Sequence, residues 1–338
     1  MTPKVARCPT QGGFAWVEIS SIHAKPAQIS LPLTYNFCML SKLFLPVILV
    51  AIAICSLAQQ PSQPPSPSPQ PADSVSVQSD IVYGAAGGEK LLLDIYEPAA
   101  PASKPRPAIV LIHGGTWSSA DKSTMHRMAN FLARSGFVAV PVNYRLMRLD
   151  ANHWPAQLDD VQRAVRWLRA NAAKYNIDPD RIGAFGHSAG AQLAALLGME
   201  DTRDNSDKAL AKYSSRVQAV VDVSGPTDFL SDHDPEGDAF LTAFFGGSYS
   251  DRPMVWRDAS PVAHVAKSNA PFLIIHGTKD DAVPIAQAQE LYDKLQKAGV
   301  AVSFVKLDDG HNISKPDTRR QLALESLTFF NRELVVSP

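Results

Sequence analysis

Residues 181–190 read Arg-Ile-Gly-Ala-Phe-Gly-His-Ser-Ala-Gly, a short apolar run followed at once by the pattern Gly-x-Ser-x-Gly. The run predicts a strand, and residues 191–197 predict a helix that starts directly after it. Glycines flank Ser188 because so tight a strand-to-helix turn leaves no room for side chains and holds the backbone in a strained region. Such a turn lifts a serine hydroxyl above the sheet edge, next to the positive end of the helix. We therefore expect a nucleophilic Ser188; the alternative is an idle serine in a glycine-rich turn.

The rest of the chain alternates apolar strands with helical patterns, which predicts an α/β fold with a mostly parallel sheet covered on both faces. The first two strands are expected at 81–83 and 91–96 and form a hairpin with Gly87-Gly88 in its turn. Further strands are expected at 108–112, 137–142, 217–223, 272–276 and 300–307. Helices are expected at 122–134, 158–173, 286–297 and 318–334. Asp178-Pro179 is expected to break the chain before the strand that leads to Ser188.

The periodic pattern weakens between Gly225 and Pro261, which predicts a small insertion near the pocket. This segment contains several aromatic residues, namely Phe240, Phe244, Phe245 and Trp256. Insertions that follow the strands of such sheets often build a pocket wall or a lid. The sequence leaves open whether this segment does so or only packs on the sheet as a surface excursion.

The first 58 residues are expected to be absent from the mature protein. Met39 is followed by a positive residue, an apolar run over 43–54 and small residues up to Ala58, which is the layout of a signal peptide cleaved after Ala58. Residues 1–38 are interpreted as an upstream extension, with Met39 as the start. The apolar run is short for a membrane span. The signal peptide predicts an exported protein, either periplasmic or secreted. The alternatives are a lipoprotein attached through Cys55 and a protein that retains the segment as an N-terminal anchor.

Residues 59–74 predict a linker rather than a packed element. Six prolines lie within residues 59–71, separated mainly by glutamine and serine, a composition typical of extended or disordered spacers. Residues 75–338 then form the catalytic domain, of a length that suits one α/β fold.

Charge and cysteine content narrow the class of protein further. The whole chain has a formal net charge of −1 and residues 1–58 contribute +3, which leaves −4 for the remainder. This mild charge argues against nucleic acid as a partner. The three cysteines, Cys8, Cys38 and Cys55, all precede the linker, so the mature part has no disulfide, thiol nucleophile or thiolate metal site. Export does not require disulfides when the core is large.

Two loops offer partners for the serine. A serine hydroxyl needs a base and an orienting carboxylate at neutral pH, and hydrolases with this turn have them in the order Ser, Asp or Glu, His. Asp280 follows the strand at 272–276 and His311 follows the strand at 300–307, so both lie at the sheet edge where ligands bind. We expect Asp280 to orient His311, and His311 to transfer the proton. Asp281 is the competing carboxylate; capping of the next helix is the alternative for both aspartates.

The stretch His113-Gly114-Gly115-Thr116-Trp117 follows the strand at 108–112 and predicts an oxyanion loop, because glycines let backbone N–H groups converge on one point. The expected donors are the amides of Gly115 or Thr116, together with that of Ala189. The alternative is a simple glycine turn.

Three further residues are expected to line the pocket: Gly114, Trp117 and His187. Trp117 is equally consistent with a pocket wall and with a core plug. The histidines at positions 113, 187 and 276 each adjoin a glycine at a strand end, so we expect them to shape loops rather than to transfer protons.

Over about residues 80–335 the chain resembles the α/β-hydrolase superfamily. Five segments are similar to the esterase branch near hormone-sensitive lipase, and most of all to bifunctional feruloyl and acetylxylan esterase-type domains: Leu93-Asp94-Ile95-Tyr96-Glu97-Pro98, His113-Gly114-Gly115-Thr116-Trp117, Asp121-Lys122, Asn143-Tyr144-Arg145-Leu146 and Gly186-His187-Ser188-Ala189-Gly190. The chain departs from the family pattern at Gly190-Ala191, usually two glycines, and at Thr116, where a third glycine occurs. These departures concern acyl specificity and not the chemistry. The resemblance also implies a structural ion pair between Arg145 and Asp160.

Together these features favour an exported serine carboxylesterase that hydrolyses short-chain acyl, acetyl or hydroxycinnamoyl esters through an acyl-enzyme. An arylformamidase has similar motifs, and export argues against it. A prolyl oligopeptidase-like exopeptidase is disfavoured because no repeats of a β-propeller precede the domain. An inactive hydrolase-fold binding protein would be expected to lack one member of the triad, and this sequence has candidates for all three.

The motifs imply no metal and no organic cofactor. The acidic stretch at 232–238 matches no calcium loop in its spacing, so a solvated loop is expected there. The expected partner is a small-molecule or carbohydrate-linked ester, with no stable membrane insertion of the mature chain; the oligomeric state stays open.

Overall fold

The computed structural model describes residues 74–231 and 238–335. The expected signal peptide, nearly all of the expected linker and most of the acidic stretch at 232–238 lie outside these ranges. Within them, no helix is both long enough and apolar enough to cross a bilayer.

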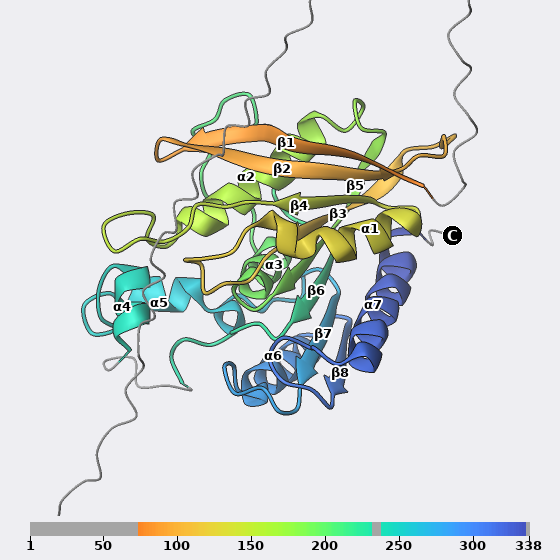
Figure 1. Ribbon diagram of the computed structural model, residues 1–338. Coiled ribbons are helices and arrows are strands. Elements are labelled where there is room, and N and C mark those ends of the chain that lie inside the picture. Colours follow the sequence, from red (N-terminus) through yellow and green to blue (C-terminus); the bar gives the residue numbers. More distant parts are fainter. Residues whose placement is uncertain (1–73, 232–237, 336–338) are drawn as a thin grey trace, which may run out of the picture. The chain divides into compact units, whose positions relative to one another are not determined.

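The core of the fold is an eight-stranded sheet in the order β1-β2-β4-β3-β5-β6-β7-β8 (Figure 1). The strands span Val75–Ala86, Glu89–Pro98, Arg106–Ile112, Val138–Val142, Ile177–His187, Ala219–Val223, Phe272–Gly277 and Val302–Leu307. β1 and β2 form the expected antiparallel hairpin, and β2 also pairs antiparallel with β4. All other neighbours pair in parallel. The predicted α/β fold with a mostly parallel sheet is therefore confirmed.

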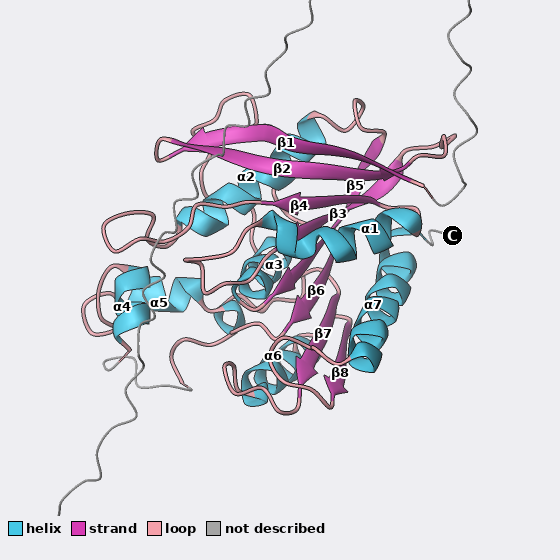
Figure 2. Cartoon of the chain, in the orientation of Figure 1, coloured by secondary structure: helices cyan, strands magenta, loops and turns pink. Residues whose placement is uncertain are grey.

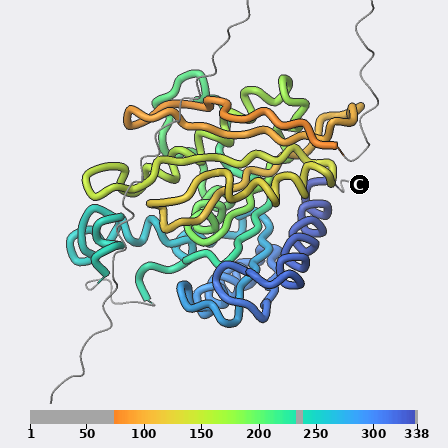
Figure 3. The backbone as a smooth tube through the Cα atoms, viewed as in Figure 1, coloured from red at the N-terminus to blue at the C-terminus, as the bar shows by residue number. Residues whose placement is uncertain are grey.

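Helices cover both faces of the sheet, as Figure 2 shows. Successive side chains of a strand point to opposite faces, and those of β3 divide accordingly: Val110 belongs to one core cluster, and Ile109 and Leu111 to the other. The first cluster includes α2 (Ala156–Ala170), α3 (Ala189–Met199) and α6 (Ile285–Lys297). The second includes α1 (His126–Arg134) and α7 (Pro316–Phe330), which lie side by side (Figure 3).

The expected break at Asp178-Pro179 is wrong, because β5 runs through both residues. The register of β5 against β3 shifts between Arg106 and Ala108, so the strand bulges there. Proline cannot donate a hydrogen bond to the ladder, and a bulge is one of the few places in a sheet that accepts it.

The helix predicted at 122–134 divides in two. A 3-10 turn at Lys122–Met125 precedes α1, and the side chain of Asp121 accepts the Ser123 N–H to cap it. A side-chain acceptor at this position satisfies a backbone donor that would otherwise lack a partner.

The insertion after β6 forms two short helices, α4 (Ala239–Phe245) and α5 (Pro253–Ala259). Phe244, Phe245 and Trp256 of these helices are completely buried in the first core cluster. Their burial anchors the insertion to the sheet, so its other side chains are held in fixed positions beside the site described next.

Candidate active site

Ser188 occupies the turn between β5 and α3. Its backbone has φ 55° and ψ −124°, a conformation that side-chain-bearing residues rarely adopt. Its N–H donates to the carbonyl of Val223 on β6 at 2.8 Å, which ties the turn to the sheet. The strained turn that the sequence predicts is present.

The two glycines of the Gly-x-Ser-x-Gly pattern are required by close backbone contacts. A Cβ atom on Gly186 would lie 2.1 Å from the carbonyl oxygen of Gly190, and one on Gly190 would lie 2.2 Å from that of Ile112. Both separations are far below van der Waals contact, so any side chain would push α3 away from β3 and β5.

Ser188, His311 and Asp280 form a continuous chain of short contacts. Nε2 of His311 lies 2.8 Å from Oγ of Ser188, and Nδ1 of His311 lies 2.8 Å from Oδ2 of Asp280. The three residues follow β5, β8 and β7, whose carboxyl ends meet at one edge of the sheet. We call these residues the relay.

The carboxylate of Asp280 is held on both of its oxygens. Oδ1 accepts the N–H groups of Ala282 at 3.0 Å and Val283 at 2.8 Å, while Oδ2 faces His311. Burial alone would raise the pKa of Asp280, but the hydrogen bonds from Val283, His311 and Ala282 outweigh it and hold that pKa below its usual range. The competing Asp281 is exposed. Of the two aspartates, Asp280 is the one that contacts His311.

His276 contacts the carboxylate of Asp280, in agreement with the loop-shaping role expected for this histidine. Its Nε2 lies 2.9 Å from the carbonyl of Val283 and 3.0 Å from Oδ2 of Asp280. Burial lowers the pKa of His276, which favours a neutral ring that donates from Nε2. The imidazole therefore braces the turn that presents Asp280. Its position at the end of β7, four residues before Asp280, was the only signal in the sequence.

The glycine-rich loop after β3 lies against Ser188. Gly115, Thr116 and Trp117 all have positive φ, at 103°, 48° and 55°, and the Gly115 carbonyl accepts the N–H groups of Ser118 and Ser119. A Cβ on Gly114 would lie 3.1 Å from Cβ of Ser188. The loop thus passes so close to Ser188 that a side chain at position 114 would be crowded.

Two of the expected oxyanion donors, Thr116 and Ala189, line the same cavity as Ser188. Gly115 and Gly114 line a neighbouring cavity instead, together with His187. Ala189 is the first residue of α3, so its N–H belongs to the positive end of that helix.

Trp117 is both a pocket wall and a core residue. Only 4% of it is exposed, its indole N–H donates to Oε1 of Gln192 at 3.0 Å, and it stacks on Phe244 with ring centroids 4.4 Å apart. The stack connects the loop after β3 to the insertion helix α4.

His187 contacts the relay histidine without joining the relay. Its Nε2 lies 3.1 Å from the carbonyl oxygen of His311, and burial lowers the pKa of His187. This contact positions the loop of His311, which agrees with the loop-shaping role expected for His187.

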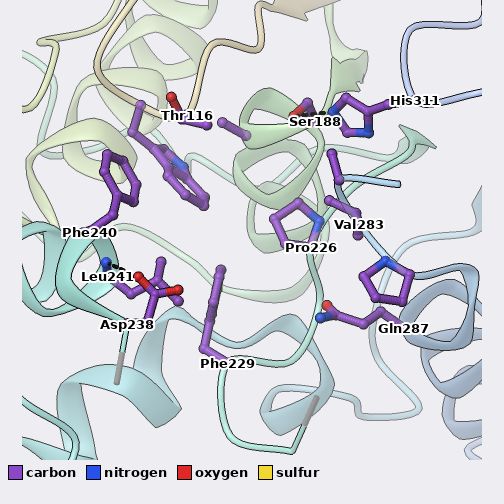
Figure 4. A pocket seen from close by; sticks show the side chains of 14 residues that line it. Thr116, Ser188, Pro226, Phe229, Asp238, Phe240, Leu241, Val283, Gln287 and His311 are labelled. Carbon is purple, nitrogen blue, oxygen red and sulfur yellow. Dashed lines mark hydrogen bonds between the residues drawn. The ribbon is translucent and has the colours of Figure 1, made fainter. Parts of the chain in front are cut away.

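The cavity above Ser188 has a volume of about 400 Å³ (Figure 4). Its walls are mainly apolar. Aromatic and aliphatic side chains of the insertion and of the loops after β3 and β7 supply most of them: Trp117, Pro226, Phe229, Phe240, Leu241 and Val283. The insertion therefore does contribute a pocket wall.

A second cavity, of about 570 Å³, lies on the other side of the loop that contains Gly114. Residues of α1 and α7 line part of it, and Ser188 is not among its lining residues. Ser188 therefore faces the cavity of about 400 Å³.

In the described part of the chain, one group of side chains has the composition of a metal site. Ligand atoms of Glu200, Asp258 and His264 lie within 4.8 Å of one another. Nδ1 of His264 lies 2.6 Å from Glu200, and Arg203 contacts Asp258 at 2.7 Å. The His264 ring and the Arg203 guanidinium already contact these carboxylates, so the group acts as a bracket between the end of α3 and α5.

The ion pair implied for Arg145 and Asp160 is present. The guanidinium contacts both carboxylate oxygens, with its NH2 group 2.8 Å from Oδ1 and Nε 2.8 Å from Oδ2. Asp160 is almost completely buried, and the pair fixes the segment after β4 to α2, away from the relay.

A serine at the strained turn after the central strand, with a histidine and an aspartate from later loops of the same sheet edge, defines the α/β-hydrolase class. The chain belongs to the BD-FAE family, whose model matches residues 93–295.

Comparisons with individual proteins agree with this assignment. Esterase LipQ of Mycobacterium tuberculosis is 33% identical over 69% of this chain and 56% of its own length. Esterase LipC of the same organism is 30% identical over 71% of this chain and 60% of its own. The chain thus spans little more than half of these relatives.

Solved structures match the domain more completely. A truncated carbohydrate esterase from gut microbiota is 27% identical, with a TM-score of 0.67 over 78% of this chain and 98% of its own. The butyrate-bound esterase Est2 of Thermogutta terrifontis is 26% identical, with a TM-score of 0.67 over 79% of this chain and 96% of its own.

Proposed function

We propose that this chain is a serine carboxylesterase in which Ser188 is the nucleophile, His311 the general base and acid, and Asp280 the orienting carboxylate. The observation that supports this most directly is the pair of 2.8 Å contacts joining Asp280 to His311 and His311 to Ser188. Membership of the BD-FAE family and the likeness to named esterases support the same activity.

The hydrogen bonds of the relay assign the first proton transfer. An ionised Asp280 can only accept, so Nδ1 of His311 holds its proton towards the carboxylate and Nε2 is left to accept from the Ser188 hydroxyl. As Oγ attacks the ester carbonyl, the serine proton passes to Nε2, and Asp280 stabilises the imidazolium that results.

The negative charge then develops on the former carbonyl oxygen. We assign its stabilisation to the amide of Ala189 at the start of α3 together with that of Gly115 or Thr116. Collapse of the intermediate expels the alcohol, which takes the proton from His311 and leaves an acyl group on Ser188. A water molecule, deprotonated in turn by His311, hydrolyses this acyl-enzyme.

We propose a short acyl group, or a compact acetyl or hydroxycinnamoyl group, as the part of the substrate held in the cavity. A volume of about 400 Å³ with aromatic walls suits such groups. The butyrate complex of the Thermogutta terrifontis esterase supports a short chain, and the gut carbohydrate esterase supports a carbohydrate-linked alcohol.

The nucleophile is tested with Ser188→Ala and an organophosphate. The variant should lose about a millionfold in kcat on a p-nitrophenyl ester while unfolding at the same temperature. Mass spectrometry of the wild type should find one phosphoryl adduct, on the peptide that contains Ser188. An adduct on another serine would refute the assignment.

The substrate class is tested with esters of increasing chain length. Activity should be greatest on acetate or butyrate and should fall steeply by about eight to ten carbons, since each methylene gains about 0.8 kcal/mol only where apolar wall meets it. Methyl ferulate, acetylated xylan, N-formylkynurenine and a peptide amide complete the panel. A maximum on laurate, or a preference for either of the last two compounds, would contradict the proposal.

A further inference from the structure

Gln287 of α6 is a polar side chain in the mostly apolar wall of the cavity that contains Ser188. Only 4% of the residue is exposed. Figure 4 shows its side chain extending towards Phe229, with Ser188 and His311 at the other end of the group of lining residues. The relay does not use Gln287.

The orientation of the Gln287 amide is determined by the backbone around it. Oε1 accepts the N–H of Thr227 at 2.7 Å and the N–H of Asp228 at 3.1 Å. An NH2 group cannot accept from two donors, so the amide cannot be reversed. The other terminal atom of the amide is therefore the nitrogen Nε2, which carries two N–H donors.

Nε2 of Gln287 has no hydrogen-bond partner within residues 74–231 and 238–335. The backbone carbonyl of Gln287 accepts the Thr227 hydroxyl at 2.9 Å and its backbone N–H donates to the Pro284 carbonyl at 3.0 Å, and neither contact involves the side-chain nitrogen. Nε2 is not among the fully buried polar atoms that lack a partner, so this donor is accessible from the cavity that Gln287 lines. A molecule in the cavity that offers an acceptor oxygen would satisfy it.

The side chains around Nε2 of Gln287 are mainly apolar. Its neighbours in the wall include Pro226, Phe229 and Val283, which offer no hydrogen bonds from their side chains. Asp238 also lines the cavity, but it is an acceptor, and its Oδ1 already takes the N–H of Leu241 to cap α4. Thr116 also lines the cavity, from the loop after β3, so at the end of the cavity that Gln287 occupies an acceptor oxygen finds its side-chain donor at Gln287 (Figure 4).

We propose that Gln287 is a specificity-determining residue that donates from Nε2 to a ketone or ether oxygen on the acyl group, several atoms from the ester carbonyl. The site accordingly favours oxygen-bearing acyl groups over hydrocarbon chains of the same length. This inference rests on the proposed esterase function, because it assumes that the acyl group occupies the cavity above Ser188.

Three p-nitrophenyl esters of equal chain length test it: pentanoate, 3-methoxypropanoate and 4-oxopentanoate. For each ester, kcat/KM of the wild type is divided by the rate of alkaline hydrolysis of that ester. This ratio should be about three- to tenfold higher for at least one of the oxygenated esters than for pentanoate, as one neutral hydrogen bond implies. The division removes the electronic effect of the oxygen on the ester.

Gln287→Glu is the informative variant. It retains an acceptor for the Thr227 and Asp228 N–H groups, which also favour its ionised form, but removes the donor. At pH 8 its preference for the oxygenated ester over pentanoate, measured as the ratio of the two corrected kcat/KM values, should disappear. Gln296→Glu, on the exposed side of the same helix, adds the same charge away from the cavity and should retain the preference.

The outcomes separate the two proposals. A wild type that hydrolyses none of the esters refutes the proposed function. A wild type without the preference, or a folded Gln287→Glu variant that keeps it, refutes only the role of Gln287. If the variant fails to fold, a crystal structure of the wild type with 4-oxopentanoate decides: a keto oxygen within hydrogen-bond distance of Nε2 supports the role, and one placed elsewhere overturns it.

Discussion

Asp280 differs from its neighbour Asp281 in what surrounds it rather than in its chemistry. Two backbone N–H groups hold one oxygen and His311 takes the other, with the ring of His276 beside it. A carboxylate held in this way can fix both the orientation and the tautomer of an imidazole. Asp281, exposed one residue later, has neither property.

Asp280→Asn should therefore lower kcat by about 10⁴, because an amide in this position can donate to His311 and favour the wrong tautomer. Asp281→Asn is the matched control and should change kcat by less than about twofold. Steady-state kinetics on p-nitrophenyl acetate, with thermal unfolding as a check on the fold, measure both. Exchanged phenotypes would assign the orienting role to Asp281.

The turn that follows β6 packs closely against the first turn of α3. Asp222 of β6 is completely buried, and its Oδ1 accepts the N–H of Gly225 at 3.0 Å while its Oδ2 has no partner among the described residues. A Cβ on Gly225 would lie 2.6 Å from that Oδ1 and 2.8 Å from Cβ of Ala191. Burial raises the pKa of Asp222 to about 7, so the carboxyl is protonated in mildly acidic solution.

Asp222→Asn should become increasingly stabilising relative to the wild type as the pH rises. The folded pKa of about 7 exceeds the unfolded value of 3.8, so the folded state binds more protons between these pH values and stability falls as they are lost. The limiting difference is on the order of 4 kcal/mol. Urea unfolding of both proteins at pH 5 and pH 8 measures it.

The control for this comparison is Asp251→Asn, which makes the same chemical change at an exposed position. A difference at position 222 that does not vary with pH would mean that Asp222 is ionised in the folded state throughout the range.

The site as a whole is assembled at the carboxyl ends of four strands. β3 leads to the glycine-rich loop, β5 to Ser188, β7 to Asp280 and β8 to His311. The insertion closes the cavity from the side, and the stack of Trp117 on Phe244 joins it to the loop after β3. Every residue assigned to catalysis or to the cavity thus lies between positions 114 and 311.

Deletion of residues 1–74 should leave kcat/KM on p-nitrophenyl acetate within about twofold of the full chain. We propose that the removed segment is a signal peptide cleaved after Ala58 and a spacer, and neither supplies a residue of the site. N-terminal sequencing of protein secreted by a bacterial host should begin at Gln59. Loss of activity on deletion, or a lipid on Cys55, would contradict this prediction.

The local parts of this molecule were readable in the sequence. The turn at Ser188, the alternation of strands and helices, and the order Ser, Asp, His depend on short patterns of apolar residues, glycines and strand ends. These patterns record local backbone requirements, such as the 2.1 Å approach that excludes a side chain at Gly186. The fold and the candidate relay therefore followed from them.

Contacts between distant segments were decided only by the tertiary structure. The contact of His276 with Asp280, the path of β5 through Pro179 and the fixed amide of Gln287 each depend on a neighbour or a register that no local pattern records. The insertion is the clearest case, because its aromatic residues lack a strong period. Burial against Trp117 and the sheet alone determines which of them pack in the core and which face the cavity.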